Sequence, residues 1–539
     1  MDIVLAATDL GHVPHVVLVC YLLILLGLGI VGYLRGKATE EDYYLAGRGQ
    51  GLLVTSLTIM ATFFSGVALL GFPGMVYEHG VSAMFLALNL PVAGAAVYLL
   101  GNGIRKLGKA RGYVSPGDMI AGYYGGSMIR IVAAVLGILY VLPYIIIQIK
   151  AGGLLAQTLF GEDMYNTGAV ALSAVTLVYV LVGGMRSVAW TDVMQGLLLL
   201  SGAVLAGIAV IASMGGPGEF FAKVAELDPK QLTMHDPAES KWNPWWILTF
   251  CLFASLASIV QPAQWMRFYA AGSSKILRRS AVIFAVVLPA CFLFGIMLVG
   301  LGGRALHPPP LPLDLEISLD FILMQINVTN LPEGLGKADQ IAVFMLREEL
   351  PVMLGGLGIV LVSIIMVAIM AASMSTADSN LHALGGVITR DVYDQFKPDA
   401  SQKQRTWVGR IVIIVTTLLA LLIVYLGENS EFGKGLLKTI AQFFFLAMAF
   451  SCQLIPAAVD ILYIRRGTRA GAIAGMITGG AVVLATLFLA GNDTIQTIKR
   501  VIDLGGLALA FNVMVFILVS LFTRKPDPEH IEEFRRDLS

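Results

Sequence analysis

Residues 58–74 read TIMATFFSGVALLGFPG, and they decide the fold because they interrupt an apolar helical span with small, polar and helix-breaking residues. A second interrupted span follows at residues 257–264, which read ASIVQPAQ. Paired interruptions at corresponding places in the two halves of a membrane chain favour an inverted-repeat architecture with a binding site at the breaks. The alternative is two proline-kinked packing helices, since glycine and proline are common in membrane helices.

Composition places the chain in a membrane. Of its 539 residues 57% are hydrophobic and only 13% are charged, with a mean hydropathy of +0.80. A soluble domain carries roughly 25% charged residues, so the chain cannot build polar shells and is predicted to be a polytopic protein of the inner or plasma membrane. Its 36 basic and 36 acidic residues balance, and no stretch of the sequence resembles a nucleic-acid footprint, so no nucleic-acid partner is expected. We find no nucleophile–base set or metal cluster, so an enzyme is not expected.

Thirteen stretches are apolar over the length of about 20 residues that a bilayer crossing needs. The interrupted spans are the second and the seventh, an offset of five, as expected of a five-plus-five inverted repeat over spans two to eleven. Basic residues gather in alternate loops, and this pattern predicts an N-terminus outside and a C-terminus inside. Arg267 is counted among the basic residues of one of these cytoplasmic loops. The spans are placed at residues 14–34, 52–77, 81–103, 128–160, 164–184, 188–213, 245–271, 279–302, 350–385, 406–427, 437–463, 469–490 and 502–523.

The predicted organisation follows this repeat. Two long outer loops, 214–244 and 303–349, belong to the second half, and each fits either a lid over an outer vestibule or a packed extracellular cap. The parts are an extra helix with the first cytoplasmic loop (1–50), the first repeat with spans two to six (51–213), the second repeat with spans seven to eleven (214–463), two C-terminal helices (464–523) and a cytoplasmic tail (524–539).

A cluster of hydroxyls lies in the ninth span, where residues 371–380 read AASMSTADSN. No charged residue separates Leu350 from this cluster, so it lies deep in the bilayer. Ser375, Thr376 and Ser379 place oxygens on neighbouring helical faces. Together with carbonyls freed at an interrupted helix, such oxygens suit a hard cation such as sodium. Single serines also pack between membrane helices, but a cluster with an intramembrane aspartate favours an ion site.

These residues resemble the sodium:solute symporter family, which contains sodium/glucose, sodium/proline, sodium/pantothenate and sodium/sialic acid transporters. The resemblance covers about residues 10–523. It implies an all-α, leucine-transporter-type fold: a five-plus-five inverted repeat with one extra N-terminal and two C-terminal helices. Its marks are ATFFS at 61–65, GGMRSVAWTDVMQ at 183–195, QWMRFYAA at 264–271, ASMSTADS at 372–379 and RGTRAGA at 466–472.

The resemblance also implies a sodium site between the first broken helix and the ninth span. Carried over by motif, its ligands are the carbonyls of Ala61, Phe64 and Ala372 and the hydroxyls of Ser375 and Thr376. Five neutral oxygens replace part of the hydration shell and still release the ion. Sodium is the expected coupling ion, with no other cofactor or metal.

Some family members have a second sodium site, which here would use Asp192, Asp378 and Ser379. The chain departs from the family pattern at Asp378, where a hydroxyl is usual, so either two carboxylates hold a cation or one is salt-bridged. Lys150 in the fourth span is the candidate partner, since a charged side chain at a helix centre costs about 2.5–3.5 kcal/mol. Three roles fit Lys150: its side chain extends outward to the bilayer surface, it pairs structurally with Asp378 or Asp192, or it neutralises a substrate carboxylate, directly or by freeing a site.

Other polar residues are candidates for solute contacts, although each equally fits a cross-link between helices. Phe63 stands where proline and sugar transporters of the family often have an acidic or amide residue, which favours a smaller or more apolar solute. The candidates are Ser65, Gly66, Asn89, Tyr144, Gln148, Lys150, Gln261 and Gln453.

The sequence therefore predicts a secondary symporter that imports sodium with a small organic solute, either a small carboxylate or an amino acid, by alternating access. A monomer suffices for this activity, and the partners are the solute, sodium and the lipid bilayer. One alternative is proton coupling in the same fold, through Asp192, Asp378 and Lys150. The other is a transporter-like membrane sensor of solute.

Overall fold

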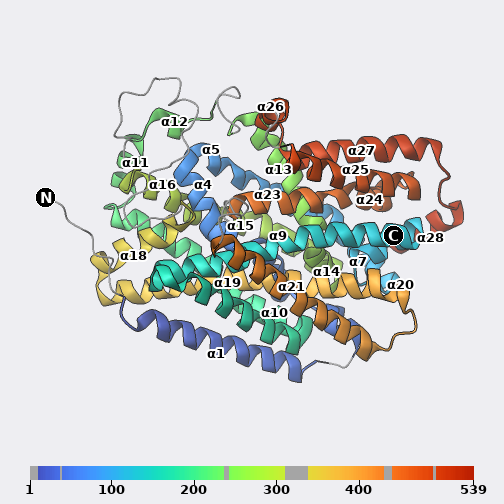
Figure 1. The fold of residues 1–539 in the computed structure, drawn as a ribbon, viewed down its shortest axis with the longest axis horizontal. Coiled ribbons are helices and arrows are strands. Elements are labelled where there is room, and N and C mark those ends of the chain that lie inside the picture. The colour runs from blue at the N-terminus through green and yellow to red at the C-terminus, as the bar shows by residue number, and fades with distance from the viewer. Residues whose placement is uncertain (1–9, 37–38, 236–241, 310–337, 430–439, 490–492) are drawn as a thin grey trace.

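The computed structural model describes residues 10–36, 39–235, 242–309, 338–429, 440–489 and 493–539. Within these residues the regular secondary structure is helical, apart from one parallel bridge between Gln50 and Ala271. Figure 1 shows long helices packed side by side, with α1 (Val13–Leu34) along one margin and α25 (Arg469–Phe488) beside α27 (Leu504–Phe522) at another. The predicted all-α membrane architecture is confirmed.

The number of spans agrees closely with the thirteen predicted. Within the described residues, ten helices are long and apolar enough to cross a membrane, and twelve spans result when each of two bent helix pairs counts as one. The remaining predicted span, 164–184, corresponds to a shorter apolar helix, Tyr165–Leu181. The unbent long spans are Val13–Leu34, Val81–Arg111, Ser127–Phe160, Gly184–Ser213, Ser274–Leu306, Gly356–Phe396, Gln402–Asn429, Phe443–Ile464, Arg469–Thr486 and Leu504–Phe522.

The two bent pairs are the interrupted spans. In the first, α3 (Leu52–Phe63) meets the segment Val67–His79, which contains a π-helical turn and α4 (Phe72–His79), at 55°. In the second, α13 (Pro244–Val260) meets α14 (Pro262–Ala270) at 56°. The break at Gln261 has a local cause, because a residue before proline is pushed out of the helical region, and its ψ is 142°.

Three long helices form the centre of the molecule. They are α9 (Ser127–Phe160), α10 (Tyr165–Ser213) and α19 (Gly356–Val387), which pack against one another, and α10 and α19 also pack against α3. Most of α9 and α19 is buried, whereas α1 and α27 expose most of their surface, as helices facing lipid do. The site residues on α9, α10 and α19 are therefore held in the interior.

Two span boundaries lie at glycines with positive φ. The predicted fifth and sixth spans meet within α10 at a sharp turn at Gly184, whose φ is 56° and ψ is −159°, close to the predicted boundary. A Cβ there would lie 2.7 Å from the Tyr43 ring, so this turn requires glycine. The ninth span begins at Gly356 rather than at residue 350, because Gly355 (φ 55°) separates it from α18 (Ile341–Leu354).

The remaining helices either form parts of the spans above or lie at their ends. Of the predicted outer loops, residues 236–241 and 310–337 lie outside the described part. The remaining helices are α2 (Glu40–Leu45), α5 (Val81–Met84), α6 (Asn89–Ala96), α7 (Asn102–Arg111), α8 (Pro116–Tyr124), α11 (Pro217–Ala225), α12 (Pro229–Leu232), α15 (Ser274–Cys291), α16 (Leu298–Leu306), α20 (Asp394–Phe396), α21 (Gln402–Asn429), α23 (Ile440–Ser451), α24 (Ile455–Val459), α26 (Asp493–Val501) and α28 (Pro528–Leu538).

Candidate functional site

The site begins at the end of α3. This helix ends at Phe63, and Phe64 follows with an extended backbone (φ −88°, ψ 92°). The last four carbonyls of a helix have no partner within it, and in a membrane interior such groups must find other partners. The carbonyl of Ala61 is one of these, and it is buried against α19.

Two hydroxyls of α19 meet that carbonyl. The Ser375 Oγ lies 3.2 Å from the Ala61 oxygen and 3.1 Å from the Ala372 oxygen, and the Thr376 Oγ1 lies 3.3 Å from the Ala61 oxygen. All four residues are buried. Four of the five sodium ligands predicted by motif are thus brought together, and the fifth, Phe64, stands at the end of α3. The group offers neutral oxygens, which suit a hard cation such as sodium.

The residues predicted for a second cation site surround a guanidinium group. Arg267 Nη2 lies 2.8 Å from Asp192 Oδ2 and also donates to the Ser379 hydroxyl. Asp378 accepts from Tyr179 at 2.8 Å and lies 2.9 Å from the Ser379 Oγ. Arg267, Asp192 and Asp378 are all buried. The assignment of Arg267 to a loop is therefore wrong, because α14 carries this side chain into the interior.

Lys150 is buried in α9. Asp192 makes its ion pair with Arg267, and Asp378 bonds to Tyr179 and Ser379. In the described residues, the two aspartates therefore contact Arg267, Tyr179 and Ser379, and none of these contacts is with Lys150.

Four predicted solute residues gather where the first span breaks. The Gly66 N–H donates to Gln148 Oε1 at 3.1 Å, and Gln148 Nε2 donates to the Tyr144 carbonyl at 3.1 Å. The Tyr144 hydroxyl lies 3.5 Å from Ser65 Oγ. All four residues are buried, and we call them the break cluster: Ser65, Gly66, Tyr144 and Gln148.

Gln261 joins the break cluster through a residue that sequence reasoning missed. The Tyr140 hydroxyl donates to Gln261 Oε1, and the Tyr140 ring stacks on Tyr144 with centroids 5.3 Å apart. Tyr140 lies one helical turn before Tyr144, and this spacing of two tyrosines was the available signal. The two broken spans are thereby connected through α9.

The other two polar candidates lie elsewhere. Gln453 accepts from Asn512 Nδ2 at 3.0 Å, so it links the helical turn after α23 to α27. The Asn89 carbonyl accepts from Ser255 Oγ at 2.7 Å, which links α6 to α13. The amide of Gln453 thus cross-links two helices, whereas the Asn89 bond is made by its backbone, and its side-chain Oδ1 is buried without a hydrogen-bond partner among the described residues. Phe63 packs its ring against Phe284 of α15, with centroids 5.1 Å apart.

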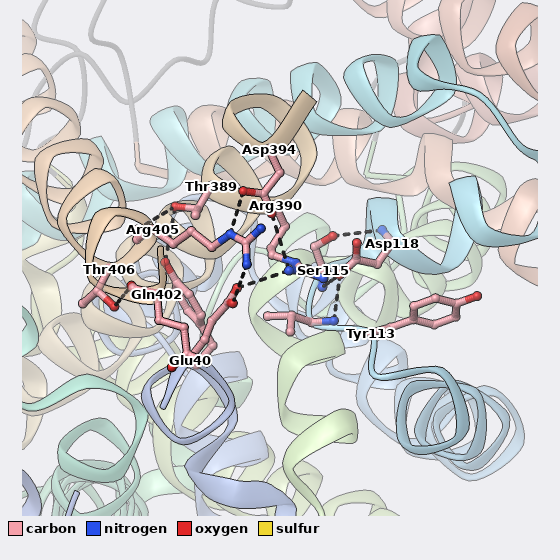
Figure 2. A network of polar contacts seen from close by, with 12 residues as sticks. Glu40, Tyr113, Ser115, Asp118, Thr389, Arg390, Asp394, Gln402, Arg405 and Thr406 are labelled. Carbon is pink, nitrogen blue, oxygen red and sulfur yellow. Dashed lines mark hydrogen bonds and ion pairs between the residues drawn. The ribbon is translucent and has the colours of Figure 1, made fainter. Parts of the chain in front are cut away.

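A network of ion pairs closes the end of the bundle that the sequence predicts to be cytoplasmic (Figure 2). Arg390 reaches Asp118 Oδ2 and Glu40 Oε1, each at 3.5 Å, and Arg405 Nε lies 2.8 Å from Asp394 Oδ1. These residues come from α2, α8, the end of the ninth span, α20 and α21. The network therefore ties segments that are up to 365 residues apart in the chain, from 40 to 405.

Two carboxyl groups of this network have opposite pKa shifts. Burial disfavours the ionised form of Asp118, yet the positive charges of Arg390 and Arg130 outweigh it and hold the pKa of Asp118 below its ordinary value. Backbone N–H groups of Val114 and Ser115 also donate to this carboxylate. For Glu40 burial dominates and raises the pKa, although arginines lie close by.

The sequence of this chain is similar to those of known sodium-coupled transporters. A sequence model of the sodium:solute symporter family matches residues 43–479. A sodium/proline symporter of Escherichia coli (strain K12) is 28% identical over 87% of this chain and 87% of its own length. A high-affinity proline transporter of Bacillus subtilis (strain 168) is 25% identical over 94% of this chain and 98% of its own.

Two solved structures share the fold. A Na+-coupled sialic acid symporter superposes with a TM-score of 0.75 at 20% identity, covering 96% of this chain and all of that one. Mhp1, a nucleobase-cation-symport-1 family transporter, superposes with a TM-score of 0.54 at 12% identity, covering 91% of this chain and 98% of that one. The fold is thus similar to that of leucine-transporter-type transporters.

Proposed function

The chain belongs to the sodium:solute symporter family, and from this we propose that it is a sodium-coupled symporter that imports a small organic solute, either an amino acid or a small carboxylate. Sodium binds at the carbonyls of Ala61, Phe64 and Ala372 and the hydroxyls of Ser375 and Thr376. Solute binds beside it, at the break cluster.

The observation that carries this proposal is the meeting of α3 and α19. The Ala61 carbonyl, at the end of a helix interrupted within the membrane, lies 3.2 Å from the Ser375 Oγ and 3.3 Å from the Thr376 Oγ1. Carbonyls of unwound membrane helices coordinate sodium in transporters of this architecture. An ion there is coordinated by oxygens of both α3 and α19. Its binding therefore stabilises the conformation of the first broken span in which these two helices are in contact.

This arrangement supports coupling because ion and solute share the same broken span. Ser65 and Gly66 of the break cluster follow Phe64 directly. Ordering the end of α3 around sodium also orders the backbone N–H of Gly66, which Gln148 holds at 3.1 Å. Each positive charge moved inward gains about 2.3 kcal/mol per 100 mV of membrane potential, which is enough to accumulate solute.

The class of solute rests on two observations. Two relatives that each cover most of the chain are named for proline transport. The break cluster and its neighbours supply aromatic rings, hydroxyls and an amide, which suit a small zwitterion or carboxylate.

The test is uptake into proteoliposomes that contain the purified full chain. The probes are labelled proline, alanine, acetate, pyruvate and glucose, each offered with an inward sodium gradient or with potassium in its place. We expect sodium to stimulate uptake of at least one amino acid or carboxylate and to leave glucose uptake at background.

Two further arms of this experiment address the rival functions. Uptake driven by a pH gradient in sodium-free buffer would show that protons, and not sodium, are the coupling ion. Solute binding without any uptake, under either gradient, would favour a sensor.

A further inference from the structure

Hydroxyl groups join the start of α25 to the end of α27. The Oγ1 atoms of Thr468 and Thr523 lie 2.6 Å apart, and the Thr468 N–H donates to Ser520 Oγ at 3.2 Å. Along their lengths the two helices pack against each other. The residues that flank these contacts, 465–469 and 524–525, therefore lie side by side at one end of the bundle.

Five positively charged side chains lie in these two segments, and within the described residues none of them forms an ion pair. One Arg465 nitrogen, Nη2, donates to the Leu462 carbonyl at 2.7 Å. Arg469 Nε donates to the Tyr124 carbonyl at 3.2 Å. These bonds orient the two guanidinium groups but leave their charge without a counter-ion. We call the five residues the basic cluster: Arg465, Arg466, Arg469, Arg524 and Lys525.

The carboxylates in the same stretches of chain are engaged with other groups. Asp460 accepts from two backbone N–H groups of its own loop and, at 2.7 Å, from the Tyr124 hydroxyl. Asp527 accepts from a backbone N–H at the start of α28. Residues 460–469 and 523–527 together carry five positive and two negative side chains, so their net charge is +3. Because four of the five basic residues are also exposed, the basic cluster is an accessible excess of positive charge.

Several other arginines at this end of the bundle have their counter-ions within the chain. Arg111 lies 2.5 Å from Asp537, and Arg405 Nε lies 2.8 Å from Asp394 Oδ1. Folding therefore explains where those charges lie. It does not explain the basic cluster, whose like charges repel one another. An anion from outside the chain relieves this repulsion when it binds.

Exposed apolar side chains place the basic cluster at the bilayer surface. Tyr463 and Ile464 come directly before Arg465, and more than half of each is exposed. Leu521 and Phe522, which are 70% and 87% exposed, lie at the end of α27 just before the second basic segment. In a membrane chain such side chains face lipid, and tyrosine favours the interface with water. The cations that follow them lie at the depth of the lipid headgroups.

We infer that the basic cluster binds the phosphate headgroup of an anionic phospholipid, whose acyl chains lie against the exposed apolar ends of the spans. Guanidinium groups suit phosphate because their planar N–H donors match its oxygens. Four to eight basic residues immediately outside a membrane helix are typical of such recognition. A lipid fits better than free phosphate because the same surface offers Leu521 and Phe522 to hydrocarbon. This site is separate from the proposed transport site and does not depend on the proposed function.

Thermal unfolding of the purified full chain in a neutral detergent tests the site. The probes are dioleoylphosphatidylglycerol, dioleoylphosphatidylcholine and inorganic phosphate, each titrated at the same ionic strength. A ligand that binds only the folded chain raises the unfolding midpoint. We expect phosphatidylglycerol to raise the midpoint with a saturable dependence on its concentration, and the other two probes to leave it unchanged.

Two triple variants, each lacking three exposed positive charges, locate the effect. Each basic residue at an anionic surface strengthens binding about fivefold. The variant of the basic cluster should therefore need about 100-fold more phosphatidylglycerol for a half-maximal shift. The matched control removes three charges at the start of α15 and should titrate as the wild-type chain does. The cluster variant combines Arg466→Gln, Arg469→Gln and Arg524→Gln, and the control combines Lys275→Gln, Arg278→Gln and Arg279→Gln.

Three results would overturn the inference. Equal losses of affinity in the two triple variants, or an unchanged titration of the cluster variant, would show that general surface charge accounts for binding. A wild-type chain that responds equally to phosphatidylcholine or to inorganic phosphate, or that responds to no probe, would exclude a site for an anionic lipid. If the cluster variant does not fold, Arg466→Gln alone decides, with an expected loss of affinity of about fivefold.

Discussion

The hydroxyl of Ser375 lies 3.2 Å from the carbonyl oxygen of Ala61, although 314 residues separate them in the chain. This contact joins the last turn of an interrupted helix to the middle of a continuous one. Ala61 belongs to the first half of the chain and Ser375 to the second, so the ion that we propose to bind between them would respond to a movement of one half against the other.

Removing either hydroxyl should weaken sodium dependence selectively. A lost neutral hydrogen-bonding or ligand oxygen costs roughly 1 kcal/mol, so Ser375→Ala and Thr376→Ala should each raise the sodium concentration for half-maximal uptake about fivefold. Ser363→Ala is the matched control, because the hydroxyl of this serine of the same helix donates to the Ile359 carbonyl one turn earlier, at 2.8 Å, and makes no other hydrogen bond within the described residues. Unchanged sodium dependence in both site variants would contradict the ligand assignment.

Gly66 should not tolerate a side chain. A Cβ at this position would lie 2.5 Å from Ser373 Oγ, 2.9 Å from Ala151 Cβ and 3.2 Å from Gln148 Oε1. Gly66→Ala must therefore displace α9 or α19 from the break, and we expect solute uptake to fall at least about tenfold.

The control for Gly66 is Gly27→Ala in α1, where a Cβ would meet no atom within 4 Å. Both variants are compared at equal amounts of protein in the membrane. Full uptake by Gly66→Ala would show that the break cluster does not depend on this close approach.

Asp118 should make stability depend on pH in acid. Its folded-state pKa lies below the ordinary value because of Arg390 and Arg130. A depressed carboxyl pKa contributes stability above the unfolded-state pKa of about 3.9, and the contribution is lost as the pH falls further. Asp118→Asn should therefore lower the thermal unfolding midpoint at pH 7, and the gap to wild type should close below about pH 4.

Glu40 provides a contrasting variant in the same network. Burial raises its pKa, so the fold favours its neutral form relative to the unfolded chain, and neutral Gln replaces it at lower cost. In tryptophan-fluorescence melts at pH 7, Glu40→Gln should lower the midpoint less than Asp118→Asn. The reverse order would mean that the arginines act mainly on Glu40.

Phe534 should hold α28 against the bundle. Its ring is fully buried, beneath the Arg111 guanidinium at 3.8 Å and edge-on to Tyr123 at 5.1 Å. Phe534→Ala removes a contact of about 3 kcal/mol, so trypsin should cut after Arg535 and Arg536 faster. Phe522→Ala, at an 87% exposed phenylalanine, should leave the rate unchanged. Equal rates for the two variants would show that α28 is held by its ion pairs alone.

The amino-acid sequence by itself determined the membrane class, the positions of nearly all spans and the two breaks. These features depend on local properties. Twenty apolar residues favour a helix in lipid, and Gln261 leaves the helical region because Pro262 follows it. The hydroxyl cluster around Ser375 was predicted from the residues of the ninth span itself, and its contact with Ala61 at the first break was predicted from the family resemblance.

Only the tertiary structure decided which charges and amides meet. Arg267 was counted with a loop because a charged side chain near a span end usually faces water, but the bend at Gln261 turns α14 inward and places it beside Asp192, 75 residues away. Gln453 was grouped with the solute residues, yet its helix faces α27 and its amide meets Asn512. A sequence pattern reveals that a polar group is buried; its partner depends on how distant helices pack, and no local periodicity encodes that.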